Sequence, residues 1–359
     1  APNALTIASY LKKNGYRTIS NGKISHFAKD AAYGWDDMFR SPRSNPKDYK
    51  DPLNIKNLKN NFGPASEFIY ADDNDYSDGK VTQKTLQDIQ SINNDDKPYF
   101  IAVGFQKPHL PFIAPKKYWD LYDRNDISLP YNNFFPPSAP KKANYFYELR
   151  KFTDIPDNGP ITDSKAKELI HAYYACVSYI DAQIGLILDE LDNQGLTNNT
   201  TVVLTSDHGF SLSEHGRWTK HNLFQYELKI PMIISSPKYK KNKTSKSFVE
   251  LVDLYPTFCD IAGLEIPDFV QGKSLIYNLK NPKKITNDIA FSRWQNGETL
   301  ISNKYYYTEW SRKGNLTHRM LYDIENDELQ MNNIAEIKSE KSIVDSLSSI
   351  LNKHIKSIN

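Results

Sequence analysis

Residues 165–205, KAKELIHAYYACVSYIDAQIGLILDELDNQGLTNNTTVVLT, hold the pattern that decides the fold class. In the first part, apolar side chains recur at three- and four-residue spacing, which predicts one long helix over 165–191. These side chains are Leu169, Tyr173, Cys176, Ile180, Ile184, Ile187 and Leu191. Gly195 is a typical helix-ending residue, and the β-branched run 201–205 after it predicts a buried strand. The stretch is therefore a helix that leads into a strand.

The same order of helix and strand recurs on both sides of this stretch. Gly15 and Gly263 each follow a helical pattern, as Gly195 does. The further predicted elements are helices at 6–14, 81–92 and 251–262 and strands at 16–20, 98–104 and 231–235. Alternating helices and strands predict an α/β fold with a mostly parallel sheet that is flanked by helices on both faces.

The pattern changes at about residue 267. Aromatic, strand-like pieces at 304–310 and 320–324 precede an amphipathic helix at 342–355. We therefore predict a main domain over residues 1–266 and a small C-terminal α+β subdomain over 267–359. Within the main domain, segments 40–75 and 125–160 are rich in Pro, Asn and Asp. We expect them to be long loops that build the substrate side, because loops carried by a rigid scaffold are the usual place for binding residues.

Composition narrows the classes of partner. The chain has 45 Lys and Arg against 43 Asp and Glu, and this net charge of +2 gives no general field to attract nucleic acid. No apolar run approaches the roughly 18 residues that a membrane span needs. The two cysteines, Cys176 and Cys259, have neither disulfide-framework nor metal-site spacing, so we expect both to be small buried hydrophobic residues.

Unusual polar clusters follow three of the predicted strands. They are NGKISH at 21–26, FQKPHLPF at 105–112, and SDHGF at 206–210 with EHG at 214–216 and WTK at 218–220. In an open parallel sheet, ligands bind outside the carboxyl ends of the strands. Lysines supply point charges for sulfate or phosphate, and an aspartate supplies oxygen to Mg²⁺ or Ca²⁺. The clusters therefore predict a site for an oxyanion and a hard cation.

At these residues the sequence resembles the sulfatase family of the alkaline-phosphatase superfamily, and most closely its iduronate-2-sulfatase-like branch. The resemblance rests on GKISH at 22–26, KPHLPF at 107–112 and SDHGFSLSEHGRWTK at 206–220, with VDLYPT at 252–257 and LYDIEND at 321–327 as later landmarks. It runs from Leu5 to about Ala335. It implies an alkaline-phosphatase-like arrangement for the main domain.

The resemblance also implies roles for residues that bind the sulfate. Asp207 and His208 would be ligands of a calcium ion, Ca²⁺, that also holds a sulfate oxygen. Lys23 and Lys220 would bind the sulfate in one pocket and offset the charge that develops on it.

Two histidines receive catalytic roles from the same resemblance. His26 would hydrogen-bond the nucleophile, and His109 would protonate the leaving sugar oxygen, which requires a cationic imidazole. Glu214 and His215 are equally well explained as structural supports of their loop and as substrate contacts.

The sequence departs from the family at its start. The family begins with a strand that ends in paired aspartates, followed by a C/S-x-P/A-x-R motif whose Cys or Ser becomes formylglycine, the nucleophile. Neither feature is present, and neither Cys176 nor Cys259 is followed by the required Pro and Arg. Because the first residues match the helix after that motif, we expect the formylglycine in an N-terminal segment of the same protein outside this sequence. A natural pseudoenzyme is the other explanation.

The predicted function is hydrolysis of sulfate esters of a carbohydrate, of the sulfated-polysaccharide or glycosaminoglycan type, with uronate 2-O-sulfates among the candidates. The alternatives are a phosphodiesterase or phosphonate hydrolase of the same superfamily and a noncatalytic protein that binds sulfated glycans. The expected partner is the sulfated carbohydrate, with no nucleic acid and no membrane span. The resemblance implies a secreted, periplasmic or lysosomal location.

Overall fold

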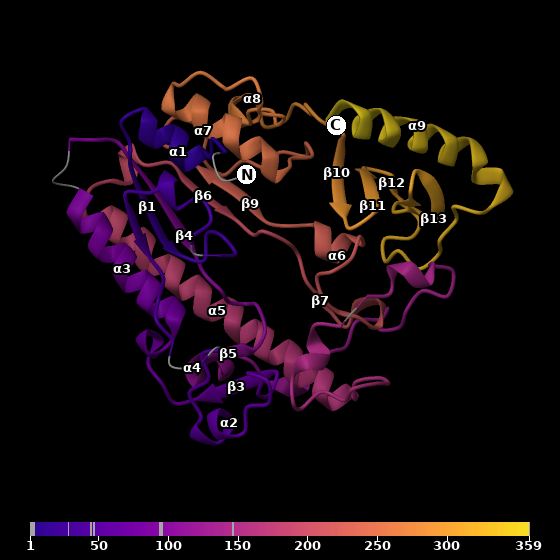
Figure 1. Cartoon of the computed structure of the whole chain (residues 1–359), viewed down its shortest axis with the longest axis horizontal. Helices are drawn as coiled ribbons and strands as arrows, with labels where there is room; N and C mark the ends of the chain where they lie inside the picture. Colours follow the sequence, from indigo (N-terminus) through magenta and orange to yellow (C-terminus); the bar gives the residue numbers. More distant parts are fainter. Residues whose placement is uncertain are drawn as a thin grey trace. The chain divides into compact units, whose positions relative to one another are not determined.

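The computed structural model describes residues 4–27, 29–43, 45, 47–92, 96–145 and 147–358. The chain forms two compact units, one of residues 1–129 with 149–200 and the other of residues 130–148 with 201–359 (Figure 1). This division follows compactness, whereas the predicted boundary between residues 266 and 267 follows a change of sequence pattern. That boundary stays a prediction, and each unit is described on its own below.

A three-stranded parallel sheet organises the first unit. Strand β1 (Arg17–Gly22) is its centre, with β2 (Asp37–Phe39) on one side and β4 (Tyr99–Gly104) on the other. Helix α1 (Ile7–Lys13), capped by the Thr6 hydroxyl, leads into β1, and α3 (Ser77–Ile92) packs against β1 and β4. The helices and strands predicted at 6–20 and 81–104 are confirmed.

Helix α5 (Asp163–Asn193) is the long helix predicted at 165–191. Its N-cap is Thr162, whose hydroxyl accepts a hydrogen bond from the Lys165 backbone, and the helix buries Cys176 completely. It packs against α3, α4 (Lys116–Trp119), β3 (Ser66–Ile69) and β5 (Phe112–Pro115). Strands β3 and β5 form a second parallel pair, and α2 (Pro52–Lys56) precedes it. Segment 40–75, predicted as loop, thus contains the short elements α2 and β3 and a 3-10 turn at Asp73–Asp75.

Strands β1 and β4 end side by side at a pair of glycines. Gly22 is in register with Gly104, and a Cβ built on Gly22 would lie 2.1 Å from the Gly104 carbonyl oxygen. A Cβ on Gly104 would lie 2.2 Å from the Lys23 carbonyl oxygen. Only glycine allows backbones to approach this closely. The segments that begin with Lys23 and with Phe105 therefore leave the same edge of the sheet, as predicted for parallel strand ends.

In the second unit, β6 (Val202–Thr205) and β9 (Met232–Ser235) match the predicted strands, but they pair antiparallel. The mostly parallel arrangement that the sequence predicts therefore does not extend to this pair. A parallel pair is usually connected by a crossover helix that packs on the sheet. Between them lie only the hairpin of β7 (Ser211–Leu212) and β8 (Trp218–Thr219) and the short helix α6 (Gln225–Leu228).

The C-terminal region of this unit is an α+β structure, as predicted. Strands β10 (Ile289–Trp294), β11 (Gly297–Ser302), β12 (Tyr305–Arg312) and β13 (Asn315–Asp323) form an antiparallel sheet in chain order. Helix α9 (Lys341–Ile358) packs on one face through Val344, Leu347 and Leu351 (Figure 1). Helices α7 (Leu254–Ala262) and α8 (Ile276–Lys280) precede the sheet. Across the described residues, no helix has the length and apolar content to cross a membrane.

Candidate functional site

The loop after β4 carries His109, and a side chain of α3 holds this loop in place. The backbone N–H groups of Gln106 and Lys107 donate to the two carboxylate oxygens of Asp78 on α3, each at 2.9 Å. The Lys107 ammonium turns inward and donates to the backbone carbonyls of His109 at 3.1 Å and Pro111 at 2.5 Å. Charged groups thus hold the His109 backbone both before and after this residue.

Lys107 and Asp78 were not assigned a role from the sequence. Both are buried, and burial lowers the pKa of Lys107 and raises the pKa of Asp78. Burying a charge costs free energy unless the charge is hydrogen-bonded. The hydrogen bonds that Lys107 and Asp78 make to the loop offset this cost. Lys107 directly precedes the Pro-His pair and could have been noticed there. Asp78 lies 29 residues before Lys107, and no local pattern connects the two.

The His109 ring is half-buried, and its Nδ1 lies 2.8 Å from the carbonyl oxygen of Leu110. A carbonyl only accepts, so Nδ1 carries the proton in this contact. The other ring nitrogen, Nε2, lies on the side of the ring that faces away from the Leu110 carbonyl oxygen. A general acid needs such a fixed orientation of its ring.

Lys23 and His26 follow β1. The Lys23 backbone N–H donates to the Gly104 carbonyl oxygen at 2.7 Å, which ties the start of this segment to the end of β4. Arg40 holds the following turn by donating to the backbone and hydroxyl oxygens of Ser25. The His26 side chain is exposed. Lys23 and His109 thus lie on segments that start from neighbouring strand ends of the first unit.

Asp207 and His208 follow β6 in the second unit. The Asp207 side chain is 74% exposed, and its Oδ1 lies 3.6 Å from Nε2 of His208. Nδ1 of His208 lies 2.7 Å from the Gly209 carbonyl oxygen. The Gly209 N–H donates to the Glu227 carbonyl, and a Cβ on Gly209 would meet the Tyr226 carbonyl oxygen at 2.1 Å. The Asp-His pair is therefore presented on a turn that rests directly on α6.

An exposed carboxylate suits a hard cation such as Ca²⁺, which takes six to eight oxygen ligands. Asp207 fits this chemistry, and His208 stands beside it. Within the described part of the chain, His, Cys, Asp and Glu side chains form no group of three or more that could hold a metal ion. Asp207 and His208 can thus supply part of a coordination shell.

Lys220 follows β8 and forms an ion pair with Glu148. Its Nζ lies 2.8 Å from Glu148 Oε2, and the two side chains are only 16% and 19% exposed. His221 Nδ1 approaches the same carboxylate oxygen at 3.6 Å. Glu148 precedes Lys220 by 72 residues, and nothing in the sequence near either residue predicts this partner. The ion pair restrains the long Lys220 side chain.

The hairpin that carries Lys220 has unusual backbone angles. Ser213, His215 and Thr219 have φ values of 87°, 54° and 77°. Positive φ is uncommon for residues other than glycine, and such residues cluster at binding and catalytic sites. Thr219 is also completely buried, next to Lys220 in sequence.

A buried ion pair anchors the same hairpin. Arg217 Nη2 lies 2.8 Å from Glu227 Oε1 on α6, and both side chains are 1% exposed. Arg217 also donates to the carbonyl of Ala143, and the Ser211 hydroxyl donates to Glu227. The strands of the hairpin and α6 therefore share one hydrogen-bonded network.

The geometry favours the structural alternative for Glu214 and His215. Glu214 Oε2 accepts a hydrogen bond from the backbone N–H of Leu212, two residues earlier. His215 is 1% exposed, and its Nε2 donates to the Leu329 carbonyl at 2.7 Å. Both side chains thus stabilise the loop between β7 and β8.

His215 predicts a pH dependence of stability. Burial, together with the nearby charge of Arg217, lowers the pKa of His215 to about 4, from 6.5. The folded state therefore keeps this ring neutral, and its contribution is complete above pH 6.5 and is lost as the pH falls toward 4. We expect the free energy of unfolding to fall by about 2 kcal/mol more in the native protein than in His215→Gln between about pH 7.5 and about pH 5. Urea unfolding at both pH values measures this difference. An equal fall of the free energy of unfolding in the two proteins would contradict the prediction.

The sequence of this chain matches two known protein families. Residues 1–264 match the family described as Sulfatase, and residues 213–357 match the family described as N-sulphoglucosamine sulphohydrolase, C-terminal. Iduronate 2-sulfatase of Homo sapiens is 30% identical over 315 residues, covering 74% of this chain and 56% of that protein. A protein named Sulfatase from Formosa agariphila is 28% identical over 364 residues, covering 97% of this chain and 69% of that protein.

Solved structures give the same fold. A protein in complex with its substrate D-glucosamine-2-N,6-O-disulfate superposes with a TM-score of 0.77 at 21% identity, covering 99% of this chain and 83% of that chain. A phosphonate monoester hydrolase from Silicibacter pomeroyi superposes with a TM-score of 0.80 at 20% identity, covering 100% and 81%.

The parallel sheet with its helices, the C-terminal antiparallel sheet and these structural neighbours define an alkaline-phosphatase-like fold, as the sequence predicted. The Sulfatase match extends over residues 1–264, well over half of the chain. The chain belongs to the sulfatase family, which confirms the resemblance found in its motifs. It spans little more than half the length of the human and mouse iduronate 2-sulfatases that it matches, 56% and 55%.

Proposed function

We propose that the full-length protein hydrolyses sulfate esters of a glycosaminoglycan-type carbohydrate. The observation that carries this proposal is the His109 loop, which Asp78 and Lys107 hold at the end of β4 beside the segment of Lys23. Such a loop restrains a proton donor on a segment that leaves the same edge of the sheet as the segment of Lys23. Membership of the sulfatase family and the named activity of iduronate 2-sulfatase support sulfate as the anion and a sugar as the leaving group.

Lys23 and Lys220 are proposed to bind the oxygens of one sulfate group. Ammonium groups that are already in place stabilise the negative charge of a transition state without reorganisation at the moment of reaction. The ion pair with Glu148 supports this role for Lys220, because it keeps the side chain from sampling many rotamers.

Asp207 and His208 are proposed to hold a calcium ion, with further ligands from the full-length protein. The exposed carboxylate of Asp207 supports this assignment. Bound Ca²⁺ would supply positive charge to a sulfate oxygen. The turn on α6 fixes the two side chains through the Gly209 backbone.

The nucleophile is proposed to be a formylglycine in a segment of the protein outside these 359 residues. His26 would donate a hydrogen bond to it, for which its exposed position is suitable. His109 would give its proton to the sugar oxygen as the S–O bond breaks, and the restrained loop supports that role. Because the proposed substrates are sulfated glycans, we also propose a secreted, periplasmic or lysosomal location.

Removal of the general acid tests this function. In the full-length protein, His109→Ala should lose at least about a hundredfold in kcat/KM on a 2-O-sulfated uronate disaccharide, the low end of general-acid catalysis. A nitrophenyl sulfate should be affected much less, because its phenolate leaves without a proton. Sulfate release from both substrates is the measurement, with the exposed His318→Ala as the matched control.

Three outcomes of this assay would count against the proposal. Equal losses on both substrates would make His109 a binding residue. Faster turnover of a phosphonate monoester than of any sulfate ester would favour the phosphonate hydrolase, whose fold is shared. Binding of the sulfated disaccharide without any turnover would identify a noncatalytic glycan-binding protein.

A further inference from the structure

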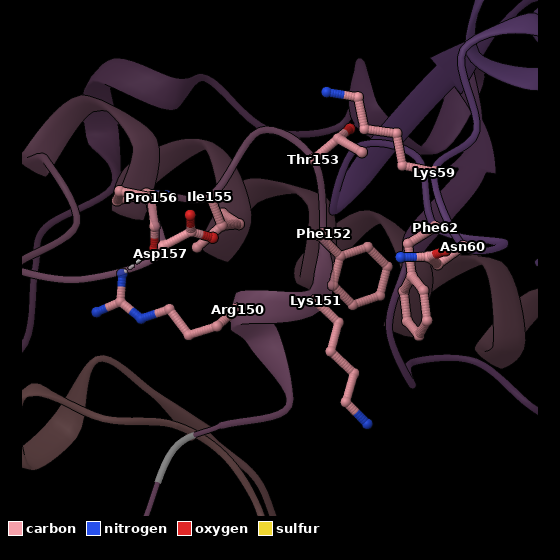
Figure 2. A pocket seen from close by; sticks show the side chains of 10 residues that line it. All are labelled: Lys59, Asn60, Phe62, Arg150, Lys151, Phe152, Thr153, Ile155, Pro156 and Asp157. Atoms are coloured by element: carbon pink, nitrogen blue, oxygen red, sulfur yellow. Dashed lines mark hydrogen bonds between the residues drawn. The ribbon is translucent and has the colours of Figure 1, made fainter.

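A cavity of about 580 Å³ opens in the first unit. None of the residues that line it is among those proposed to bind sulfate or metal or to act as general acid. One wall comes from residues 59–62 and the other from residues 150–157 (Figure 2). These belong to segments 40–75 and 125–160, which the sequence predicts to build the substrate side. So far the proposed function involves one residue of these segments, Glu148, which pairs with Lys220.

The charges that line the cavity are mainly positive. Lys59, Arg150 and Lys151 contribute three cations, and Asp157 is the one acid among the lining residues. The whole chain has a net charge of only +2, so this excess is a local property. Lysine and arginine side chains that line a concave surface attract anionic groups. The cavity is therefore suited to an anion.

Arg150 has a fixed place in this cavity. Its guanidinium donates to the backbone carbonyls of Pro156 and Gly159, which close the loop around it. Burial lowers the pKa of Arg150, and the charge of Asp157 opposes that shift. Figure 2 shows the side chain of Arg150 extending along the 150–157 wall toward Asp157. Bonds to carbonyls position the guanidinium while leaving its positive charge in place.

Two aromatic rings form the centre of the cavity. Phe62 and Phe152 come from opposite walls and meet edge to face, with 5.2 Å between the ring centroids (Figure 2). Phe152 is buried, whereas Phe62 is half-buried, and the Lys47 ammonium lies over the Phe62 ring, 4.4 Å from its centroid. Aromatic rings provide a flat apolar surface on which the C–H face of a sugar can pack. Cations around such a surface match an anionic sugar.

The cavity walls are hydrogen-bonded to the frame of the His109 loop. The Thr153 N–H donates to the Gly63 carbonyl, and the Ala65 N–H donates to the carboxylate of Asp154. The Ala65 carbonyl in turn accepts from the N–H of Phe112, where the 105–111 loop ends and β5 begins. Hydrogen bonds within the first unit thus connect the cavity walls with the end of the loop that carries His109.

We propose that this cavity is a subsite for an anionic sugar unit, sulfated or carboxylated, of a longer chain whose sulfate ester is cleaved at His109. This inference rests on the proposed function and specifies its substrate as an oligosaccharide. The cations attract the charged substituent, and the exposed part of Phe62 contacts the sugar ring. The subsite adds binding energy for a longer substrate and leaves the chemical step unchanged.

The test reverses the two exposed lysines of the cavity in the full-length protein. For Lys59→Glu/Lys151→Glu, KM for a sulfated tetrasaccharide should rise about tenfold, as expected for loss of two exposed charge contacts. The kcat on this substrate and the KM for the disaccharide of its cleaved end should stay within about twofold of the native values. Lys240→Glu/Lys241→Glu, on an exposed loop of the second unit, makes the same change of net charge and should affect neither substrate.

The outcomes separate this inference from the proposed function. An equal rise of KM on the disaccharide, or an unchanged KM on the tetrasaccharide, would overturn the subsite while the hydrolase stands. If no sulfate ester is cleaved, the proposed function fails and calorimetric titration with the tetrasaccharide still decides the cavity. Weaker binding by the Lys59/Lys151 variant than by the control would then support an anionic-sugar site. Equal affinities, or equal binding of an unsulfated and uncharged tetrasaccharide, would overturn it.

Discussion

Lys220→Ala is expected to lower kcat/KM for a sugar sulfate about 150-fold in the full-length protein. This corresponds to a loss of about 3 kcal/mol of transition-state stabilisation, the size found when one donor of an oxyanion site is removed. The physical reason is that the Lys220 ammonium is held in place by Glu148 at 2.8 Å and is mostly shielded from water. Initial rates of sulfate release, taken over a range of substrate concentrations, measure the loss.

A matched control separates this effect from a general change of charge. Lys241 lies on an exposed loop of the same unit, so Lys241→Ala removes one lysine without touching the hairpin. We expect its kcat/KM to stay at the native value. Near-native turnover in Lys220→Ala would remove this residue from the proposed sulfate site.

Arg217→Met is expected to reduce the free energy of unfolding by about 4 kcal/mol. Removing one partner of a buried ion pair leaves the other charge without compensation, and losses of this size follow. In this variant the Glu227 carboxylate loses the Arg217 guanidinium, which lies 2.8 Å away in the native pair. The Glu227 side chain, only 1% exposed, then has no buried cation beside it. Burial raises the pKa of Glu227 even in the native pair. Equilibrium unfolding in urea at neutral pH measures the change.

The paired variant Arg217→Met/Glu227→Leu is the control for this prediction. Replacing both charges by apolar side chains of similar size is often close to neutral, because no charge remains buried. We therefore expect the double variant to recover most of the loss. A single variant that loses less than about 1 kcal/mol, or a double variant that is no better than the single one, would contradict this account of the hairpin.

The long elements of the fold could be predicted because their patterns are local. Helix α5 repeats apolar residues over many turns, and β6 is a run of β-branched residues, so both were found within a few residues of their observed limits. The direction in which β6 pairs with β9 depends on the connection between them, which no local pattern encodes. Strands β3, β7 and β8 are too short to show an alternation.

The site divides in the same way. Lys23 and His109 could be located because polar residues directly after a strand mark the edge of a parallel sheet. The groups that hold the His109 loop and Lys220 could not, since Asp78 and Glu148 lie far in the sequence from the residues they contact. The roles of Asp207 and Lys220 came from resemblance to a family, and they stay proposals.

The central claim is the proposal that Lys23 and Lys220 act on one sulfate group. A double-mutant cycle with Lys23→Ala and Lys220→Ala, measured as kcat/KM for the same sugar sulfate in the full-length protein, tests it most directly. Residues that serve the same group lose their effects non-additively, so the double variant should fall short of the summed losses by at least about 1 kcal/mol. Losses that add to within about 0.5 kcal/mol would show that the two lysines act independently, and would contradict the claim.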